Sequence, residues 1–326
     1  MISVVMPAYN ASSYIAEAIE SILKQTFRDF EFIIIDDGST DSTVMIAEQY
    51  GKQDERIKLI QSEHIGVSRA RNLGTKEAKY DWVAVMDADD IALPERFEQQ
   101  MKAAHSFPEV VAWGTYAHHI NSKNEILSLV QQGATTSEEF YELRQDGHIP
   151  FVVHPTALLR KEILLKVGGY DQNFPAALDF ELLDRMANHG PILAIPEPLL
   201  LYRIHSQSIS MQKFFLQQML ARYVIARHRA KIAGLPEPDL DEFKEQYEHP
   251  PILLGVDRRR RTLGQFWYRK AGLLYAEKSY IQSGFFLSMA ISFHPLYSIP
   301  RIWNQKFRPV FDKWLSFFQN TDKKAI

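Results

Sequence analysis

The chain contains no cysteine among its 326 residues. Disulfide bonds and thiolate metal sites are therefore excluded. The absence is compatible with a reducing compartment, and we expect a cytoplasmic protein. The first residues run directly into a hydrophobic segment of the strand type, so we expect no signal peptide.

Several common sequence signatures are also missing. There is no Walker A glycine-lysine loop, no G-x-G-x-x-G dinucleotide fingerprint and no G-x-S-x-G nucleophile elbow, which argues against the most frequent alternative enzymes. No uninterrupted apolar stretch is long enough to span a bilayer. The chain is nevertheless 46% hydrophobic, enough to bury the core of one large domain and a smaller one.

Charge is distributed unevenly along the chain. Residues 1–210 carry 18 Lys and Arg against 30 Asp and Glu, a balance of −12, whereas residues 211–326 carry 19 against 10, a balance of +9, and the two add to the net −3. This asymmetry indicates a separate second module beginning near residue 211.

Short apolar segments alternate with helical patterns in the first part of the chain. We predict strands at residues 2–6, 30–35, 57–60 and 82–86, and helices at residues 15–23, 42–50 and 68–78. The strands are almost wholly apolar, which is typical of a parallel sheet covered on both faces, so the expected fold class is α/β. Pro7 is expected to end the first strand.

Polar side chains follow these strands at the points where the strands end. In open α/β sheets, ligands bind outside the carboxyl ends of the strands. We therefore expect one crevice lined by the residues Tyr9, Asp36, Asp37, Arg69 and Asp87 to Asp90.

The segment Asp87-Ala88-Asp89-Asp90 follows a predicted buried strand and crowds three carboxylates at its end. Like charges this close repel one another unless a cation or a donor neutralises them, so the segment indicates a divalent metal held by oxygen ligands. The alternative is an acidic turn in which Asp90 caps the helix that follows Pro94.

Six segments carry a resemblance to a known family. The segments VVMPAYNASSYIAEAIESILKQT, FEFIIIDDGSTDST, GVSRARNLGTKEA, WVAVMDADD, HPTALLRKEILLKVGGYD and LDFELLDRM resemble, in order and spacing, the successive motifs of family 2 glycosyltransferases over residues 2–210. The resemblance implies a GT-A fold and an inverting transferase that uses a uridine or deoxythymidine diphosphate sugar with Mg²⁺ or Mn²⁺. It divides the chain into a GT-A domain at 1–210, with donor binding in 1–95 and the acceptor and catalytic part in 96–210, and a helical module at 211–326.

Donor-binding roles follow from the resemblance and from the chemistry of the residues. Asp89 is the expected metal ligand, because a metal that bridges both phosphates stabilises the charge of the leaving group. Arg69 is placed to meet the base or a phosphate, while Arg71 is as well explained as a solvated helix residue. Asn72, Gly74 and Gly38 are assigned to packing and turns. The remaining expected donor contacts are Pro7 and Ala8 near the ribose, Tyr9 stacked on the base, Asp37 on the uracil imide, and Asp87 with Ala88 at the sugar or ribose hydroxyls.

The acceptor side is expected from the later motifs. In the family a Glu-Asp pair supplies the general base, so Asp179 is the candidate, although Leu178 replaces the Glu and a helix N-cap is the alternative role for Asp179. Glu181 is the reserve carboxylate. His154 either contacts the sugar or is structural, and His205 is expected to approach the diphosphate or the metal.

The basic second module is predicted to be helical. Helical patterning begins near Gln212, an arginine run at 258–261 precedes another helical stretch, and residues 266–293 suggest a helix pair. Aromatic and basic residues then recur at helical spacing from Trp303 to Phe318. This stripe indicates either an anionic membrane surface or docking on the protein itself, and Pro309 would kink a continuous helix.

We expect an enzyme that moves one sugar from a nucleoside diphosphate, most simply a UDP-sugar, to a hydroxyl of a glycan or lipid-linked glycan in cell-surface polysaccharide synthesis. It would be cytoplasmic, with peripheral attachment to the inner face of the membrane as an open alternative. The rivals are a nucleotidyltransferase, which would carry a Gly-rich basic signature after its first strand, and a non-catalytic glycan-binding scaffold. No nucleic-acid partner is expected, and an oligomer stays open.

Overall fold

The computed structural model describes residues 1–206 and 208–303. The chain forms two compact units, Met1–Phe243 and a second unit from Lys244 onward. The sequence places a boundary after residue 210, whereas the first unit continues to Phe243. The reason is that α9 (Phe214–Ile232) packs against α7 (Leu178–Met186) and so belongs to the first unit.

The first unit is built on a nine-stranded mixed sheet with the order β3-β2-β1-β4-β8-β6-β9-β5, and β7 pairs with β6. The first four strands in that order are parallel, and β8 runs antiparallel to β4. The change of direction therefore falls beside β4. The strands are β1 (Ile2–Ala8), β2 (Phe30–Asp37), β3 (Ile57–Ser62), β4 (Trp82–Val85), β5 (Ile91–Ala92), β6 (Ala112–Ile120), β7 (Ile126–Val130), β8 (Leu158–Arg160) and β9 (Ile192–Arg203).

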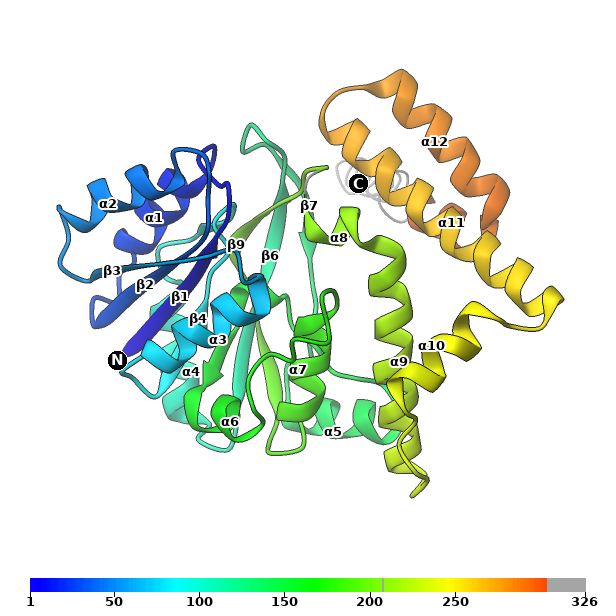
Figure 1. The fold of residues 1–326 in the computed structure, drawn as a ribbon, viewed down its shortest axis with the longest axis horizontal. Coiled ribbons are helices and arrows are strands. Elements are labelled where there is room, and N and C mark those ends of the chain that lie inside the picture. The colour runs from blue at the N-terminus through cyan, green and yellow to red at the C-terminus, as the bar shows by residue number, and fades with distance from the viewer. Residues whose placement is uncertain (207, 304–326) are drawn as a thin grey trace, which may run out of the picture. The chain divides into compact units, whose positions relative to one another are not determined.

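Helices cover both faces of the parallel strands (Figure 1). The helices α1 (Ile15–Leu23) and α2 (Thr43–Gly51) lie on one face and α3 (Val67–Glu77) on the other, as right-handed crossovers require once the strand order reverses after β3. A Cβ at Gly74 of α3 would lie 2.4 Å from Val5 Cγ1 on β1. The expected packing role of Gly74 is thus confirmed.

The predicted strands are all present, but three of them, β1, β2 and β3, are longer than the sequence suggests. Pro7 does not end β1, which continues to Ala8, because β4 pairs with β1 only from Ile2 to Val5 and the ladder at Pro7 continues with β2 alone. The strand β2 likewise includes Asp36 and Asp37. The two-residue strand β5 was not predicted, since two residues carry no periodicity.

The remaining elements of the first unit complete the second half of the sheet. A 3₁₀ turn, η1 (His154–Thr156), leads into β8. The other helices are α4 (Arg96–Ser106), α5 (Ser137–Gln145), α6 (Lys161–Lys166) and α8 (Ile209–Gln212), and α10 (Leu240–Glu248) crosses the boundary between the units.

The second unit is helical, as predicted. It contains α11 (Ile252–Ala276), α12 (Tyr280–Phe293) and α13 (Pro295–Ile302). The expected helix pair is α11 and α12, but α11 begins at Ile252, so the arginine run at 258–261 lies inside this helix instead of before it. Among the described residues, no helix is long and apolar enough to cross a membrane. Beyond Trp303, the aromatic and basic stripe lies outside the described residues.

Candidate functional site

The site lies at the carboxyl ends of the parallel strands. The pairing of Ala8 with Asp36 brings the ends of β1 and β2 level, and Met86, just after β4, donates its backbone N–H to Val5 O at 3.1 Å. Loops that leave these three strands therefore emerge at one edge of the sheet. This edge adjoins β8, where the strand direction changes, and matches the expected crevice.

Three carboxylates meet at this edge. Oxygen atoms of Asp87, Asp89 and Asp90 all lie within 4.8 Å of one another. Burial raises the pKa of Asp87. Burial and the negative charges of Asp89 and Asp87 raise the pKa of Asp90 well above its ordinary value. Asp90 is fully buried, and its Oδ2 atom has no hydrogen-bond partner within the described part of the chain. Clustered carboxylate oxygens, one of them buried and unpartnered, fit a hard divalent cation.

Asp90 does not cap a helix. Its Oδ1 atom accepts the backbone N–H of Arg203 at 2.8 Å, and the residue at the N-cap of α4 is Glu95. The alternative capping role is wrong because β5 intervenes between Asp90 and α4. Asp90 instead fixes the acidic loop to the end of β9.

The fully buried guanidinium of Arg203 holds the same loop from the other side. Its Nε atom donates to Asp89 O at 2.7 Å, and its Nη2 atom reaches Glu17 Oε2 of α1 at 2.9 Å. It also donates to Asn121 O and Asn124 Oδ1 and stacks over Tyr14 with 4.4 Å between the guanidinium carbon and the ring centroid. One cation thus ties the acidic loop to α1 and to the turn between β6 and β7.

His205 lies two residues beyond β9, beside the acidic cluster. Its Nε2 atom is 2.8 Å from Asp89 Oδ2. Both side chains keep some exposure, 18% for His205 and 30% for Asp89. Their contact brings together the two residues that the sequence suggests as metal ligands.

Arg71 is a buried member of the site and not a solvated helix residue. Its Nη2 atom lies 2.5 Å from Asp87 Oδ1, and only 9% of its side chain is exposed. The solvated alternative is wrong because α3 turns this position toward the acidic loop after β4. Arg71 also lies over the ring of Tyr170, 5.5 Å from its centroid.

Tyr170 connects Arg71 to His154. The His154 Nε2 atom is 2.9 Å from the Tyr170 hydroxyl, and burial, with a smaller effect of the Arg71 charge, lowers the pKa of His154 well below its ordinary value. His154 is therefore a buried neutral imidazole. Asn72 holds the same tyrosine, accepting its backbone N–H and donating to its carbonyl, both at 2.8 Å, so the expected packing role of Asn72 is confirmed.

Asp37 is bonded to the loop that precedes α3. Its carboxylate accepts the backbone N–H groups of Ile65 at 2.7 Å and of Gly66 at 3.0 and 3.1 Å. His64 of that loop lies 3.2 Å from Asp37 Oδ2 and stacks on the ring of Tyr9, with 4.2 Å between the ring centroids. Gly38 makes this approach possible, since a Cβ there would lie 2.7 Å from His64 N and its φ is +75°.

Asp179 lies in the first turn of α7. The N-cap of this helix is Ala177 with φ +54°, so the alternative role of Asp179 as the cap is wrong. Burial raises the pKa of the half-buried Asp179, while the Arg71 charge lowers it and the Asp87 charge raises it. These effects place Asp179 within electrostatic range of the Arg71–Asp87 pair.

The reserve carboxylate Glu181 is fully engaged in ion pairs. It is 1% exposed, accepts from Arg185 at 2.6 and 2.7 Å, and accepts from Arg227 of α9 at 3.0 Å. Arg227 also reaches Asp184 Oδ2 at 3.3 Å, and Arg144 reaches Asp184 Oδ1 at 3.2 Å. Through its ion pair with Arg227, Glu181 holds α7 against α9.

The remaining predicted donor residues lie around the strand ends. Arg69 is exposed and donates from Nε to Gln172 Oε1 at 2.8 Å, and Tyr9 is 49% exposed. Ala8 and Ala88 are buried, Pro7 is half-buried, and Asp36 accepts the backbone N–H of Ser39 at 3.2 Å.

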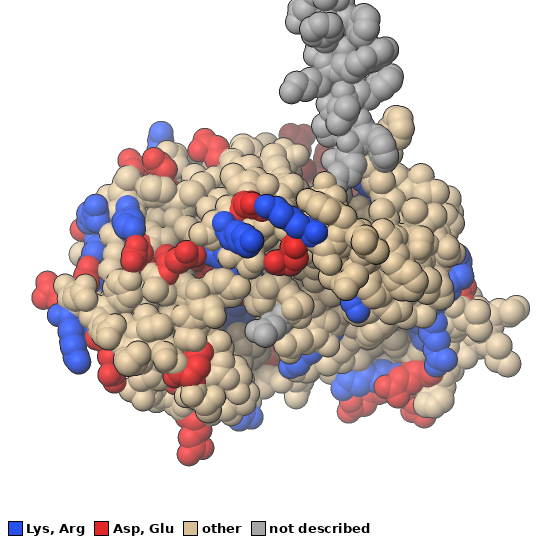
Figure 2. Space-filling model, turned by 90° about the horizontal axis from the view of Figure 1, so that it is seen from above, with Lys and Arg blue, Asp and Glu red and all other residues tan. Residues whose placement is uncertain are grey.

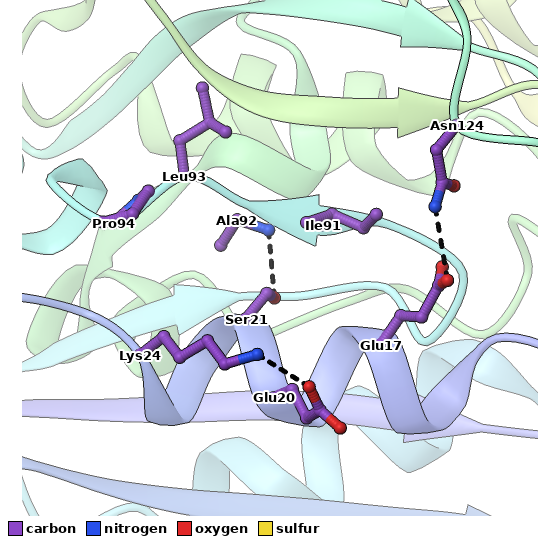
Figure 3. A pocket seen from close by; sticks show the side chains of 9 residues that line it. All are labelled: Glu17, Glu20, Ser21, Lys24, Ile91, Ala92, Leu93, Pro94 and Asn124. Carbon is purple, nitrogen blue, oxygen red and sulfur yellow. Dashed lines mark hydrogen bonds and ion pairs between the residues drawn. The ribbon is translucent and has the colours of Figure 1, made fainter.

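A pocket of about 310 Å³ lies apart from this edge, between α1 and β5 (Figure 3). Its polar side chains pair with one another, Lys24 with Glu20 at 2.7 Å and Asn124 with Glu17 at 3.2 Å. Glu17 also accepts a hydrogen bond from Arg203, and Arg203 in turn donates to the Asp89 carbonyl. The pocket wall therefore helps to hold the acidic loop in place.

Comparison with known proteins identifies the chain. The model of glycosyl transferase family 2 matches residues 3–168, half of the chain. An uncharacterized glycosyltransferase of Methanocaldococcus jannaschii is 31% identical over 232 residues, 70% of this chain and 79% of that relative. The chain belongs to glycosyl transferase family 2. The O-antigen biosynthesis glycosyltransferase WbnJ of Escherichia coli is 34% identical over 224 residues, 64% of this chain and 81% of WbnJ.

Solved structures show the same GT-A fold as this glycosyltransferase. Staphylococcus aureus TarS 1–349, solved in complex with UDP, aligns with a TM-score of 0.55 at 18% identity. The alignment covers 94% of this chain and 93% of the TarS chain. The mannosyltransferase PcManGT of Pyrobaculum calidifontis, solved with GDP-Man and Mn²⁺, has a TM-score of 0.54 at 16% identity and covers 89% and 86%. The expected family and fold class are confirmed.

Several residues of the glycosyltransferase site were not identified from the sequence. His64, Arg203 and Arg227 lie outside the six segments that carry the resemblance, and Tyr170 lies within one of them but was given no role. The sequence offered one usable signal, because Arg71 lies three and four residues before the small residues Gly74 and Thr75 and therefore shares their buried face of α3. A buried arginine near an acidic loop is the pairing to look for.

Proposed function

We propose that this glycosyltransferase moves a sugar from a UDP-sugar to a hydroxyl of a glycan acceptor with inversion of the anomeric configuration. The observation that carries the proposal is the cluster of Asp87, Asp89 and Asp90 at the strand ends, with Arg71 bonded to one of its members. Asp87 bonds Arg71 directly, and Asp89 and Asp90 lie beside Asp87. The positive charge of Arg71 also lowers the pKa of Asp179, which burial raises. Donor diphosphate and acceptor hydroxyl would meet between these groups.

The acidic cluster would hold Mg²⁺ or Mn²⁺, with Asp89 as the principal ligand and His205, Asp87 and Asp90 beside it. A bound divalent ion would supply positive charge for the departing diphosphate. Before it binds, Arg71 offsets the charge of Asp87, and the Arg203 backbone donates to Asp90. The structural neighbour PcManGT was solved with Mn²⁺, and this supports the choice of a divalent ion for the acidic cluster.

The donor nucleotide would lie against β1, β2 and α3. The Asp37 carboxylate accepts the backbone N–H groups of Ile65 and Gly66, and a uracil imide N–H would bond the same carboxylate in place of or beside His64. Tyr9, backed by His64, presents an exposed ring on which the base would stack. Pro7 and Ala8 would approach the ribose, Asp87 and Ala88 the sugar or ribose hydroxyls, and Arg69 a phosphate.

Asp179 would act as the general base. The acceptor oxygen forms a bond to the anomeric carbon, the bond from that carbon to the diphosphate oxygen breaks with its electron pair, and the hydroxyl proton passes to Asp179. A raised pKa suits this role, since a stronger base takes a proton more readily. Glu181 is excluded from it by its arginine partners, and His154 would line the site as a neutral group through Tyr170.

The acceptor would be a growing glycan or a lipid-linked glycan of the cell surface, reached from the cytoplasmic face of the membrane. The name of WbnJ, an O-antigen biosynthesis enzyme, supports this class of acceptor. A peripheral position on that membrane would bring the site to lipid-linked acceptors.

A screen of nucleotide sugars tests the proposal. Each UDP-, dTDP- and GDP-sugar is incubated with the full chain and Mn²⁺, and hydrolysis and thermal stabilisation are recorded. We expect one UDP-sugar to stand out, and a ligand at 100 times its dissociation constant should stabilise the fold by about 2.7 kcal/mol. The variant Glu138→Gln, on an exposed face of α5, is the matched control. Absence of any hydrolysis or stabilisation would favour a non-catalytic scaffold, and release of pyrophosphate from a nucleoside triphosphate would favour a nucleotidyltransferase.

A further inference from the structure

The helix α12 carries no charged residue along its 14 residues, YIQSGFFLSMAISF. Surface helices of globular proteins normally place charged residues on the side away from the core, and a helix that is apolar all round is normally buried. The helix α12 is not buried on all sides, because Ile281 is 92% exposed and Phe285 is 60% exposed. Two large apolar side chains one turn apart thus face solvent.

One side of α12 is fixed to α11. Ser283 Oγ donates to Ala271 O of α11 at 2.8 Å, and the rings of Trp267 and Phe286 stack with 5.3 Å between centroids. Ser283 and Ala290 are buried on this side. The opposite side follows the helical repeat through Ile281, Phe285, Ser288 and Ser292, all of them exposed. We call these four residues the outer face of α12.

Figure 2 shows a broad area without charged side chains on the right of that view. The exposed apolar surface of the second unit extends beyond α12. Leu296 of α13 is 86% exposed, and Ile252 and Leu253 at the start of α11 are 84% and 85% exposed. The unit therefore presents apolar side chains on each of its three main helices.

The charges of the same unit are strongly unbalanced. From Ile252 to Trp303 there are eight Lys and Arg and two Asp and Glu, a balance of +6. The two acids, Asp257 and Glu277, lie on α11 and just after it. The outer face of α12 thus belongs to a unit with a large positive charge.

We propose that the outer face of α12 is a membrane-docking surface that lies in the interface of an anionic lipid bilayer. Apolar side chains would enter the boundary between headgroups and acyl chains, while the surrounding Lys and Arg attract anionic headgroups. A second copy of the chain fits less well, because a symmetric contact through this face would bring together two basic segments, each with a balance of +6 from Ile252 to Trp303. This inference rests on the proposed function in one respect, because a lipid-linked acceptor would be reached at the membrane surface.

The test uses the full chain and vesicles of phosphatidylcholine alone or with about 30% phosphatidylglycerol, at low and high salt. Binding is measured by co-sedimentation. We expect the wild-type chain to bind the anionic vesicles, to bind less in high salt, and to bind neutral vesicles weakly. The double variant Ile281→Glu/Phe285→Glu should bind the anionic vesicles at least roughly tenfold more weakly, because both side chains lose their transfer from water.

Two controls keep the result interpretable. Met45→Glu replaces one apolar side chain by Glu at an exposed position on α2, adding one negative charge there, and should leave vesicle binding unchanged. Circular dichroism and thermal unfolding of the double variant report whether the unit is still folded, and Ile281→Ser/Phe285→Ser, without added charge, should show the same direction of change.

The outcomes separate the possible occupants. Equal vesicle binding by the wild type and both double variants, or no binding by the wild type at low salt, overturns the proposal. Dissociation of an oligomer by the double variants, measured by light scattering without vesicles, assigns the face to a second copy and overturns it as well. Hydrolysis of the soluble donor should be unchanged in the double variants, so a failed transferase assay in the wild type is a separate result that concerns the proposed function alone.

Discussion

The guanidinium of Arg71 on α3 lies 2.5 Å from the carboxylate of Asp87, which follows β4. This pair joins the nucleotide side of the site to the acidic cluster, and both partners are largely buried, at 9% and 27% exposed. Removing the cation leaves Asp87 beside Asp89 and Asp90 without its closest positive charge. The pair is therefore a place where stability and donor binding should depend on the same contact.

Arg71→Met should lower both the free energy of unfolding and the affinity for the donor. A double-mutant cycle with Asp87→Asn should give a coupling energy of about 1 to 3 kcal/mol in urea unfolding, since neighbouring partners are not additive. Arg69→Met, two residues away and exposed, is the control and should change stability little. Additive effects of the two site variants would show that the pair is not energetically coupled.

Asp89→Ala should abolish turnover and the Mn²⁺ dependence of donor binding while the protein stays folded. The reason is that Asp89 is the proposed principal ligand, and its carboxylate contacts His205 but bonds no backbone group as the Asp90 carboxylate bonds the Arg203 N–H. Calorimetric titration with Mn²⁺ and circular dichroism check the two halves of this expectation. Wild-type activity that persists undiminished in excess chelator would remove the metal from the mechanism.

Asp179→Asn should leave folding and donor affinity nearly intact while sugar transfer falls about 10²- to 10⁴-fold, the usual contribution of a general base. Wild-type transfer should fall toward acid pH as Asp179 takes up a proton, at a pH above the ordinary value of 3.8 because burial raises its pKa. The residual activity of the variant should lack this acid limb. Glu181→Gln is the comparison, and it should lose stability first, through its two arginine partners.

Metal-free stability should fall as the pH rises above about 4. The pKa of Asp90 is raised in the folded state above 3.8, so the folded chain binds more protons than the unfolded chain in the window between the two values. The contribution of this group is fully present below 3.8 and is lost as the pH passes through the folded value. Urea unfolding from pH 4 to 8 measures it, and Asp90→Asn, which keeps an acceptor for the Arg203 N–H, should flatten the profile. An unchanged slope in this variant would assign the decline to other groups.

Arg227→Met should slow transfer more than it weakens donor binding. Arg227 bonds Glu181 at 3.0 Å and Asp184 at 3.3 Å, so it holds the helix that carries Asp179. Breaking a buried charge pair on one side costs roughly 3 to 5 kcal/mol, and the half-buried Arg227 should reach the lower part of this range. Steady-state kinetics should show a lower kcat at similar donor KM, with partial rescue by Arg227→Lys. Arg222→Met, on the exposed side of the same helix, should have no such effect.

Local sequence patterns were sufficient for much of the site. Apolar runs predicted β1 to β4, and the acidic residues after β4 were correctly expected to meet, because a short run and its flanking loop are adjacent in the chain. The family resemblance also suggested that His205 lies near the metal-binding residues, and His205 does contact Asp89. These expectations needed no knowledge of how distant segments pack.

Two of the misses at the site depend on packing between distant segments, and one depends on a very short strand. Arg71 looked like a surface residue because its partner Asp87 lies 16 positions away on another element. Glu181 looked like a spare acid because Arg227 is 46 positions away on a helix that the sequence assigned to the second module. Asp90 looked like a helix cap because β5 is too short to leave a periodic signal.

The bond between Asp90 and the Arg203 backbone spans 113 positions of the chain. The acidic loop therefore takes its final shape only after β9 has joined the sheet, a late event for a contact of such high sequence separation. During synthesis the first 95 residues emerge well before β9 exists, so they cannot make this contact on their own. We therefore expect the acidic loop of a nascent chain to be fixed only once the chain also holds the strand from which the loop of His205 departs.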